Sequence, residues 1–120
     1  MITVKDIIWI DEKSGEADVL LSDEEYFVEC FCSDCSLSVG DVFFDMVHGF
    51  NVTSIYRSFE KKSEVVRKNG IYHLKGQLID LKNLTLRIGE FGFDLSEGNV
   101  PNDIKENEFV EVNLSRIDIY

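Results

Sequence analysis

Three cysteines, Cys30, Cys32 and Cys35, form the densest group of nucleophilic or metal-ligating side chains in the sequence. Zinc in proteins takes four nitrogen, sulfur or oxygen ligands, and structural zinc sites draw them from two separate ligand pairs. The sequence has no second cysteine pair. Cys30 and Cys32 also share an alternation with Tyr26 and Val28 that is typical of a buried strand face, where cysteine acts as a small hydrophobic residue. We therefore expect two core cysteines, a turn cysteine at position 35, and neither metal nor cofactor.

The two histidines do not combine with other residues into a catalytic pattern. In a regular strand His48 would point away from Asp45, and His73 would lie on a strand surface. The sequence contains no glycine-rich phosphate loop, nucleophile elbow or zinc-protease helix. Acidic pairs such as Glu24-Glu25 lie in expected turns, where water-exposed carboxylates are poor general acids. These patterns predict a protein that is not an enzyme.

Charge is sorted along the chain. Residues 1–54 hold 12 acids and 2 bases, residues 55–89 hold 3 acids and 8 bases, and residues 90–120 hold 8 acids and 2 bases, which gives a net charge of −11. Charge of one sign over a long segment affects solubility and the choice of partner more than the fold. In a closed barrel with neighbouring first and last strands, the two acidic segments would form one face. The basic segment would then form an opposite face or neutralise part of the first acidic segment across a strand pair.

The acids of the first segment gather around two expected turns and predict a surface for a basic protein partner. Electrostatic attraction of that kind raises association rates in a salt-sensitive way. The simpler interpretation is a set of solvated turns that maintains solubility. The candidate partner-binding residues are Asp11, Glu12, Glu16, Asp18, Asp23, Glu24 and Glu25.

The basic segment supports an alternative hypothesis, a nucleic-acid-binding surface. Proteins that bind single strands combine aromatic rings, on which bases stack, with cations that follow the phosphates. The candidate residues of this kind are Tyr56, Arg57, Lys61, Lys62, Arg67, Lys68 and Tyr72. The net charge of −11 opposes the approach of a polyanion, so a protein partner is favoured over nucleic acid.

Alternation with a period of two dominates the sequence and predicts strands. Hairpins are expected around residues 11–16 and at Lys82-Asn83, and a long strand at 109–120. The alternation shifts at Gly89-Glu90 and again at Ser115-Arg116, which indicates bulges or tight bends. Residues 59–68 are too polar for a broad helical face, so a short helix and a charged hairpin are both open. The prediction is a single all-β domain over residues 1–120, an antiparallel small barrel or curled sheet of about seven or eight strands with at most one short helix near 59–68.

Two turn-to-strand segments, residues 38–43 and 105–110, carry an architectural resemblance. In each, a Gly or Asn suited to the left-handed region precedes an acid and then an apolar strand. Such entries resemble those of small OB-fold and SH3-like barrels, which implies an OB-like fold and no particular function. In charge, size and lack of catalytic motifs the chain is also similar in general character to immunity proteins and antitoxins. That resemblance implies inhibition of a basic toxin, such as a nuclease.

Length and composition predict a globular cytoplasmic protein. A chain of 120 residues with 44% hydrophobic content can bury one core without disulfides. No apolar stretch is long enough to span a bilayer, and the N-terminal residues do not resemble a signal peptide. The odd and crowded cysteines are typical of a reducing compartment. The oligomeric state and the identity of the partner do not follow from these patterns.

Overall fold

The computed structural model describes all 120 residues and is built from strands and connecting turns, without a helix. No segment therefore forms a helix that is long and apolar enough to cross a membrane. The 12 strands are β1 (Ile2–Asp11), β2 (Glu16–Ser22), β3 (Phe27–Cys32), β4 (Val42–Phe43), β5 (Val47–Phe50), β6 (Tyr56–Arg57), β7 (Glu64–Lys68), β8 (Ile71–Asp80), β9 (Thr85–Ile88), β10 (Phe91–Asp94), β11 (Phe109–Leu114) and β12 (Arg116–Ile119).

All strands belong to one mixed sheet, in the order β4-β1-β2-β3-β12-β5-β10-β9-β8-β11-β6, with β7 paired to β8. The sheet is not closed. The predicted small antiparallel barrel of seven or eight strands is therefore wrong, although the all-β class is right. Two parallel pairs, β3 with β12 and β5 with β10, account for the mixed character. Both join strands that are distant in sequence, so local alternation carries no sign of them.

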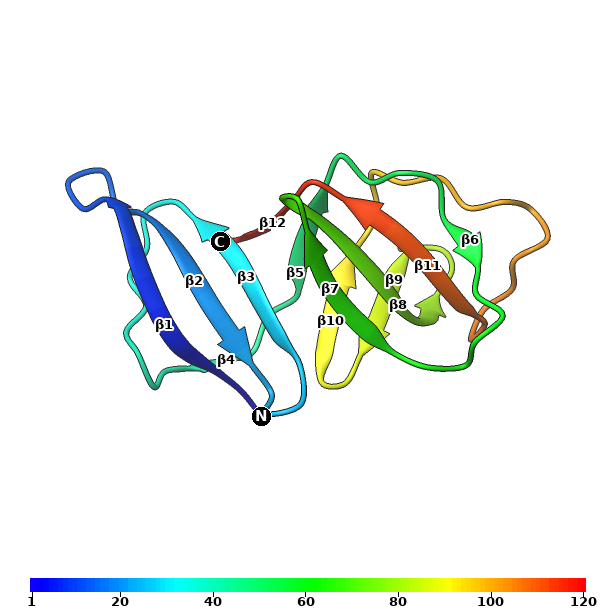
Figure 1. Cartoon of the computed structure of the whole chain (residues 1–120), viewed down its shortest axis with the longest axis horizontal. Coiled ribbons are helices and arrows are strands. Elements are labelled where there is room, and N and C mark those ends of the chain that lie inside the picture. Colours follow the sequence, from blue (N-terminus) through cyan, green and yellow to red (C-terminus); the bar gives the residue numbers. More distant parts are fainter.

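The molecule is elongated, with extents of 46 × 27 × 25 Å. Strands β1–β4 form one part and β5–β11 form the other, and β12 connects the two by pairing with β3 on one side and β5 on the other (Figure 1). The shift in alternation at Ser115-Arg116 marks the point where the chain leaves β11, which pairs with β8, and enters β12. The prediction of a break at this position is confirmed.

The core contains 25 buried hydrophobic residues from both parts. In β1 the inward side chains change parity, from Ile2 and Val4 to Ile7 and Trp9, because the register with β2 shifts between Val4 and Asp6. This β-bulge at Lys5 explains why both sides of β1 are apolar in the sequence. Cys30 and Cys32 are buried in β3 as predicted.

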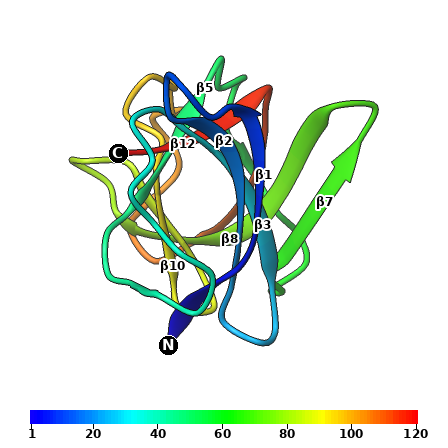
Figure 2. The same ribbon diagram turned by 90° about the vertical axis from the view of Figure 1, so that its left-hand side faces the viewer.

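Two turns decide what happens at Gly89-Glu90 and in residues 59–68, where the sequence left the local structure open. Gly89 has a φ of 57° and forms the turn between β9 and β10, so the shift at Gly89-Glu90 is a hairpin turn. Residues 59–68 contain no helix. Their second half is β7, which pairs with β8 through a turn at Asn69-Gly70, where both residues have positive φ. The charged hairpin was the right alternative, and it projects to one side of the molecule in Figure 2.

Candidate functional site

The candidate site is the solvent-facing side of strands β1–β3, here called the outer face. Side chains that lie directly opposite each other in neighbouring strands point to the same side of a sheet. The register pairs Asp6 with Leu20, Ile8 with Asp18, Leu20 with Glu29 and Asp18 with Phe31, so these residues share one side. The opposite side carries Val19, Leu21, Val28 and Cys30, which are fully buried. The outer face thus combines three carboxylates with three apolar side chains: Asp6, Ile8, Asp18, Leu20, Glu29 and Phe31.

A groove runs along the outer face towards the second part of the molecule. Its smaller part is a hollow of about 70 Å³ among Asp6, Ile8, Asp18, Leu20 and Glu29. Its larger part, of about 190 Å³, is lined by Asp18 and Glu29 again, together with residues of β7, β8 and β12. Because the two hollows share Asp18 and Glu29, they adjoin at these two carboxylates.

Two arginines line the larger part of the groove. Arg67 of β7 forms an ion pair with Glu29 at 3.1 Å, and its guanidinium lies 5.2 Å from the ring centre of Tyr72. Arg116 binds the Asp118 carboxylate through two nitrogens, at 2.7 and 2.9 Å, and lies over the ring of Phe31. Both cations are therefore already engaged by acids and aromatic rings, which lowers their availability for an anionic ligand.

Tyr72 joins the two parts beneath this groove. Its hydroxyl donates to the Glu29 carbonyl oxygen at 2.8 Å and accepts from the Glu29 N–H at 3.2 Å. Burial raises the pKa of Tyr72 to about 12, so the phenol stays protonated and keeps donating. This residue belongs to the core and is not available for stacking on a nucleic-acid base, as the nucleic-acid hypothesis required.

Asp18 is the acid in the groove whose ionisation is most clearly disfavoured. Burial, and next the negative charge of Glu29, raise the pKa of Asp18 above its usual 3.8, while Arg67 offsets part of that effect. A carboxylate in this situation is stabilised by an additional cation. No base lies within ion-pair distance of Asp18.

The structure separates the predicted partner-binding acids into two groups. Asp11, Glu12 and Glu16 lie at the tip of the β1–β2 hairpin, whereas Asp23, Glu24 and Glu25 lie in the turn at the other end of β2. A strand of this length spans roughly 20 Å. Asp18 lies between the groups, on the outer face. The sequence did not single out Asp6 and Glu29, because each is an isolated acid within an apolar strand and only the register shows which side it faces.

The acids in the β2–β3 turn have structural roles. The Asp23 carboxylate accepts N–H groups from Glu25 at 3.0 Å, Tyr26 at 2.8 Å and Glu90 at 2.9 Å. Burial opposes ionisation there, but these bonds prevail and lower the pKa of Asp23. Glu24 forms an ion pair with Lys5. At the hairpin tip, by contrast, Asp11, Glu12 and Glu16 have no basic partner.

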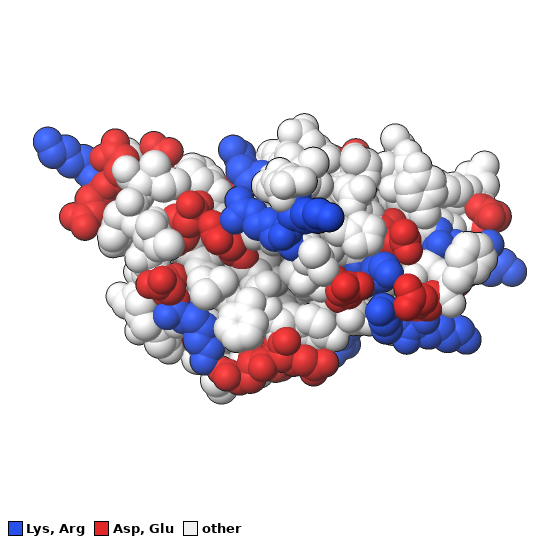
Figure 3. All heavy atoms as spheres, viewed as in Figure 1, with Lys and Arg blue, Asp and Glu red and all other residues white.

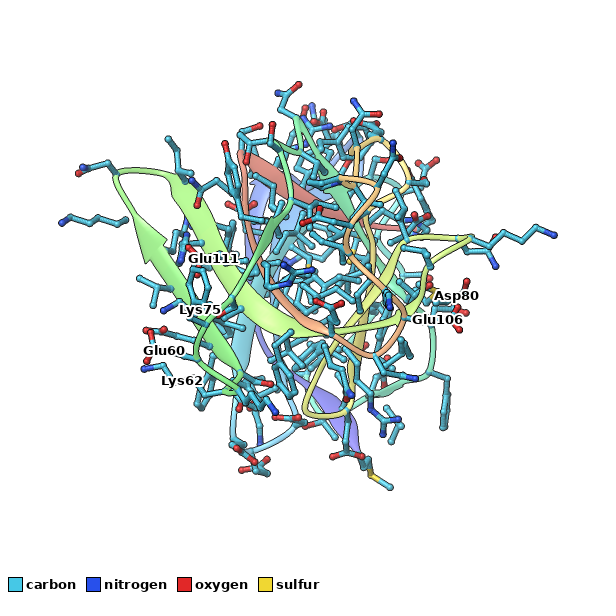
Figure 4. All side chains as sticks on the ribbon, turned by 90° about the vertical axis from the view of Figure 1, so that its right-hand side faces the viewer. Glu60, Lys62, Lys75, Asp80, Glu106 and Glu111 are labelled. Atoms are coloured by element: carbon cyan, nitrogen blue, oxygen red, sulfur yellow. The ribbon has the colours of Figure 1, made fainter.

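Half of the cations in the basic segment are neutralised by acids. Arg57 pairs with Glu108 at 2.7 Å and with Asp103 at 3.5 Å. Lys62 and Lys75 both pair with Glu60, which lies between them in Figure 4. With Arg67, this makes four of the eight cations between residues 55 and 89. Lys61 and Lys68, also candidates for nucleic-acid binding, have no ion-pair partner, and Tyr56 is exposed.

The acids of the β1–β2 hairpin tip and those of the loop between β10 and β11 lie at opposite ends of the molecule. The hairpin tip of β1–β2 is at the left end of Figure 1 and the loop between β10 and β11 is at the right end. Asp103 and Glu108 of the late loop form ion pairs with Arg57, whereas the acids of the hairpin tip form no ion pair. Over β1–β3, acidic side chains outnumber basic ones, and over the rest of the same face the two alternate (Figure 3). The two acidic segments therefore do not form one face.

The cysteines and histidines are held in structural contacts. Burial raises the pKa of Cys30 far above its usual range, and burial and Cys35 raise that of Cys32 to about 12. Both thiols therefore stay protonated at neutral pH, a poor state for attack or metal binding. His48 Nδ1 lies 3.0 Å from Asp94 Oδ2, and Asp45 lines the same surface pocket. No group of three or more His, Cys, Asp or Glu side chains is arranged to hold a metal ion.

Comparisons of the chain with protein-family models, with curated proteins and with solved structures gave no match.

Proposed function

We propose that this protein is a non-catalytic module that binds a basic protein partner through the outer face of β1–β3. The observation that carries the proposal is the juxtaposition of unpaired acids and uncovered apolar groups on this face. Asp6 and Asp18 have no basic partner, and Ile8, between them in the groove, is 60% exposed. Acid and apolar surface together suit a lysine or arginine side chain, whose aliphatic stem packs while its charged end meets carboxylate.

Asp18 and Glu29 supply a reason for a cation to bind in the groove. Two carboxylates held close together on one sheet face repel each other, and Arg67 compensates for only part of that repulsion. A cation from a partner reduces this cost and displaces the proton that Asp18 binds at low pH. Affinity for a basic ligand should therefore fall as the pH falls through the raised pKa of Asp18.

The class of partner follows from charge. A protein with a basic surface, such as a toxin or nuclease, suits the acidic outer face, and inhibition of such a protein is the activity we propose. Three free cysteines are in keeping with action in the cytoplasm. The basic segment supports a nucleic-acid-binding function less well, since half its cations are paired and Tyr72 is buried.

The proposal is tested with a short fluorescent peptide of alternating lysine and threonine. The wild-type protein should bind it with an affinity that decreases as salt increases. Asp6→Asn combined with Asp18→Asn should weaken binding roughly fivefold or more, by analogy with partly exposed ion pairs. The matched control, Asp103→Asn with Glu106→Gln, removes the same charge from the late loop and should change affinity much less. Equal losses in both variants, or tighter binding of oligothymidine than of the peptide, would refute the proposal.

A further inference from the structure

One edge of the sheet lacks a partner over most of its length. Strand β1 pairs with β2 from Thr3 to Asp11, but on its other side it pairs with β4 only at Ile2 and Thr3. The Val4 N–H and C=O complete that contact by bonding Asp41 and Gly40. From Lys5 to Asp11 no backbone–backbone hydrogen bond forms on the outer edge, and the Ile7 N–H donates only to the carboxylate of its neighbour Asp6, at 2.9 Å. Because alternate residues of a strand direct their N–H and C=O groups to each edge, this edge offers further N–H and C=O groups without a backbone partner.

The same seven residues expose an unusual amount of apolar surface. Ile8 is 60% exposed, Ile10 57% and Trp9 41%. Consecutive apolar residues on an open edge favour pairing with another strand. The charged residues Lys5, Asp6 and Asp11 lie near the ends of the open segment and leave its centre uncharged.

The order of residues along this edge is complementary to itself when the strand is reversed. In an antiparallel pairing centred on Ile8, Ile8 faces Ile8 of the second copy, and Ile7 faces Trp9 in both directions. Asp6 faces Ile10 on each side of this centre, and at each end Lys5 of one copy, which also pairs with Glu24 of its own chain, faces Asp11 of the other. Apolar pairs thus occupy the centre and opposite charges the two ends, both of which stabilise antiparallel strands.

We propose that two copies of this chain associate through the open edges of β1, antiparallel, around a twofold axis at Ile8. An isologous contact of this kind closes after two copies and cannot continue into a fibre. The contact shares Asp6 and Ile8 of β1 with the proposed binding face, but it does not depend on the proposed function, because strand pairing uses the backbone edge of β1. A single pair of strand edges buries little area, so the association should be weak and dependent on concentration.

The first test is the molar mass by sedimentation equilibrium at increasing protein concentration. The mass should rise from 13.8 kDa towards twice that value. Ile8→Lys, which places two ammonium groups at the axis, should hold the protein at the single-copy mass. The control is Ile71→Lys in β8, since Ile71 is 50% exposed on a different strand, and it should leave the association unchanged. A wild-type mass that stays constant at 13.8 kDa would overturn the proposal. So would an equal loss of association in Ile71→Lys.

The second test determines the register of the contact between the two copies. It compares two single variants with their mixture, so its result does not rest on one variant alone. Lys5→Glu alone places two acids at each end of the contact, and Asp11→Lys alone places two bases there, so each variant should stay single. A mixture of the two variants restores opposite charges at both ends and should associate again. Both variants retain a negative net charge, so overall attraction cannot explain recovery. Failure to recover in the mixture, with both variants folded by circular dichroism, would contradict the proposed register.

A basic strand from another protein is the competing occupant of this edge. If such a strand is the occupant, the edge should bind the alternating lysine–threonine peptide equally well after Lys5→Glu. Mixing the two charge variants should then not restore any association between copies. Single-copy behaviour of the wild type, combined with peptide binding that Ile8→Lys abolishes and Asp18→Asn leaves intact, would assign the edge to such a strand and exclude the second copy. Loss of peptide binding with intact association would instead reject only the proposed function.

Discussion

Asp23 shows how one carboxylate can connect the two parts of the molecule. One of its oxygens accepts the N–H groups of Glu25 and Tyr26 in its own turn, and the other accepts the N–H of Glu90 in the β9–β10 turn. The Met1 ammonium also pairs with the Glu90 side chain. Nearby, a side chain at Gly89 would press against the Asp23 carboxylate and approach the Tyr26 ring within 2.8 Å. The acid that the sequence analysis proposed for partner binding therefore connects the β2–β3 turn with the β9–β10 turn.

Asp23→Asn should lower the free energy of unfolding by about 1–3 kcal/mol, because hydrogen bonds to an ionised acceptor are replaced by weaker ones. Urea denaturation at neutral pH measures the change. Glu12→Gln serves as the control, since the Glu12 side chain is exposed at the hairpin tip and forms no hydrogen bond, and it should leave the midpoint nearly unchanged. A midpoint for Asp23→Asn equal to that of the control would contradict this role.

Asp94 should contribute to the acid sensitivity of the fold. Burial opposes its ionisation, but hydrogen bonds from Ser96 and His48 prevail and lower the pKa of Asp94 below 3.8. The folded state thus favours the ionised form, so this stabilisation is present above about pH 4 and is lost as the pH falls through the lower, folded value. Asp94→Asn should reduce the fall in urea midpoint on acidification. Asp45→Asn, at an exposed acid without hydrogen bonds, should retain the wild-type dependence.

At the scale of the elements, the sequence predicted local structure well and long-range pairing poorly. The hairpins at residues 11–16 and at Lys82-Asn83, and the breaks at Gly89-Glu90 and Ser115-Arg116, are local properties of alternation and turn residues, and all are present. The strand expected from Asp41 is divided into β4 and β5. The insertion of β12 between β3 and β5 depends on contacts between distant residues, which alternation does not encode. That insertion converts the expected barrel into an open mixed sheet.

Two glycines within strands give a matched prediction at this scale. A Cβ at Gly76 in β8 would lie 2.7 Å from the Arg87 carbonyl oxygen and 2.6 Å from Ile88 Cγ1, whereas one at Gly92 in β10 would meet nothing closer than 3.5 Å. Gly76→Ala should therefore lower the free energy of unfolding by about 1–3 kcal/mol, the usual cost of an overpacked site. Gly92→Ala should be close to neutral. Thermal unfolding of both variants checks this, and equal melting temperatures would count against the close approach of β8 and β9.

In the whole molecule, the charged segments of the chain do not form the two opposite faces that the sequence suggested. The basic segment neutralises the late acidic loop through Arg57 and reaches Glu29 through Arg67, and the acids of the first hairpin remain without partners. The sequence indicated those acids correctly as a concentration of charge. It could not show that Asp23 and Glu24 are engaged or that Asp6 and Glu29 join Asp18, because the strand register decides which acids share a face.

If two copies pair through β1, the sheet continues from one copy to the other. Each copy then presents its own acidic outer face, and a partner with two basic sites could engage both. Such bivalent binding raises the overall affinity without any new contact. The proposed association and the proposed function would then reinforce each other.

Mapping where a basic ligand binds shows whether the outer face of β1–β3 receives it. Backbone amide resonances of the isotopically labelled protein are followed during titration with the lysine–threonine peptide. We expect smaller shifts in the loop between β10 and β11 and the largest shifts at Asp6, Ile8, Asp18, Leu20 and Glu29. Shifts concentrated in that loop or around Arg57, or no shifts at low salt, would contradict binding at the outer face.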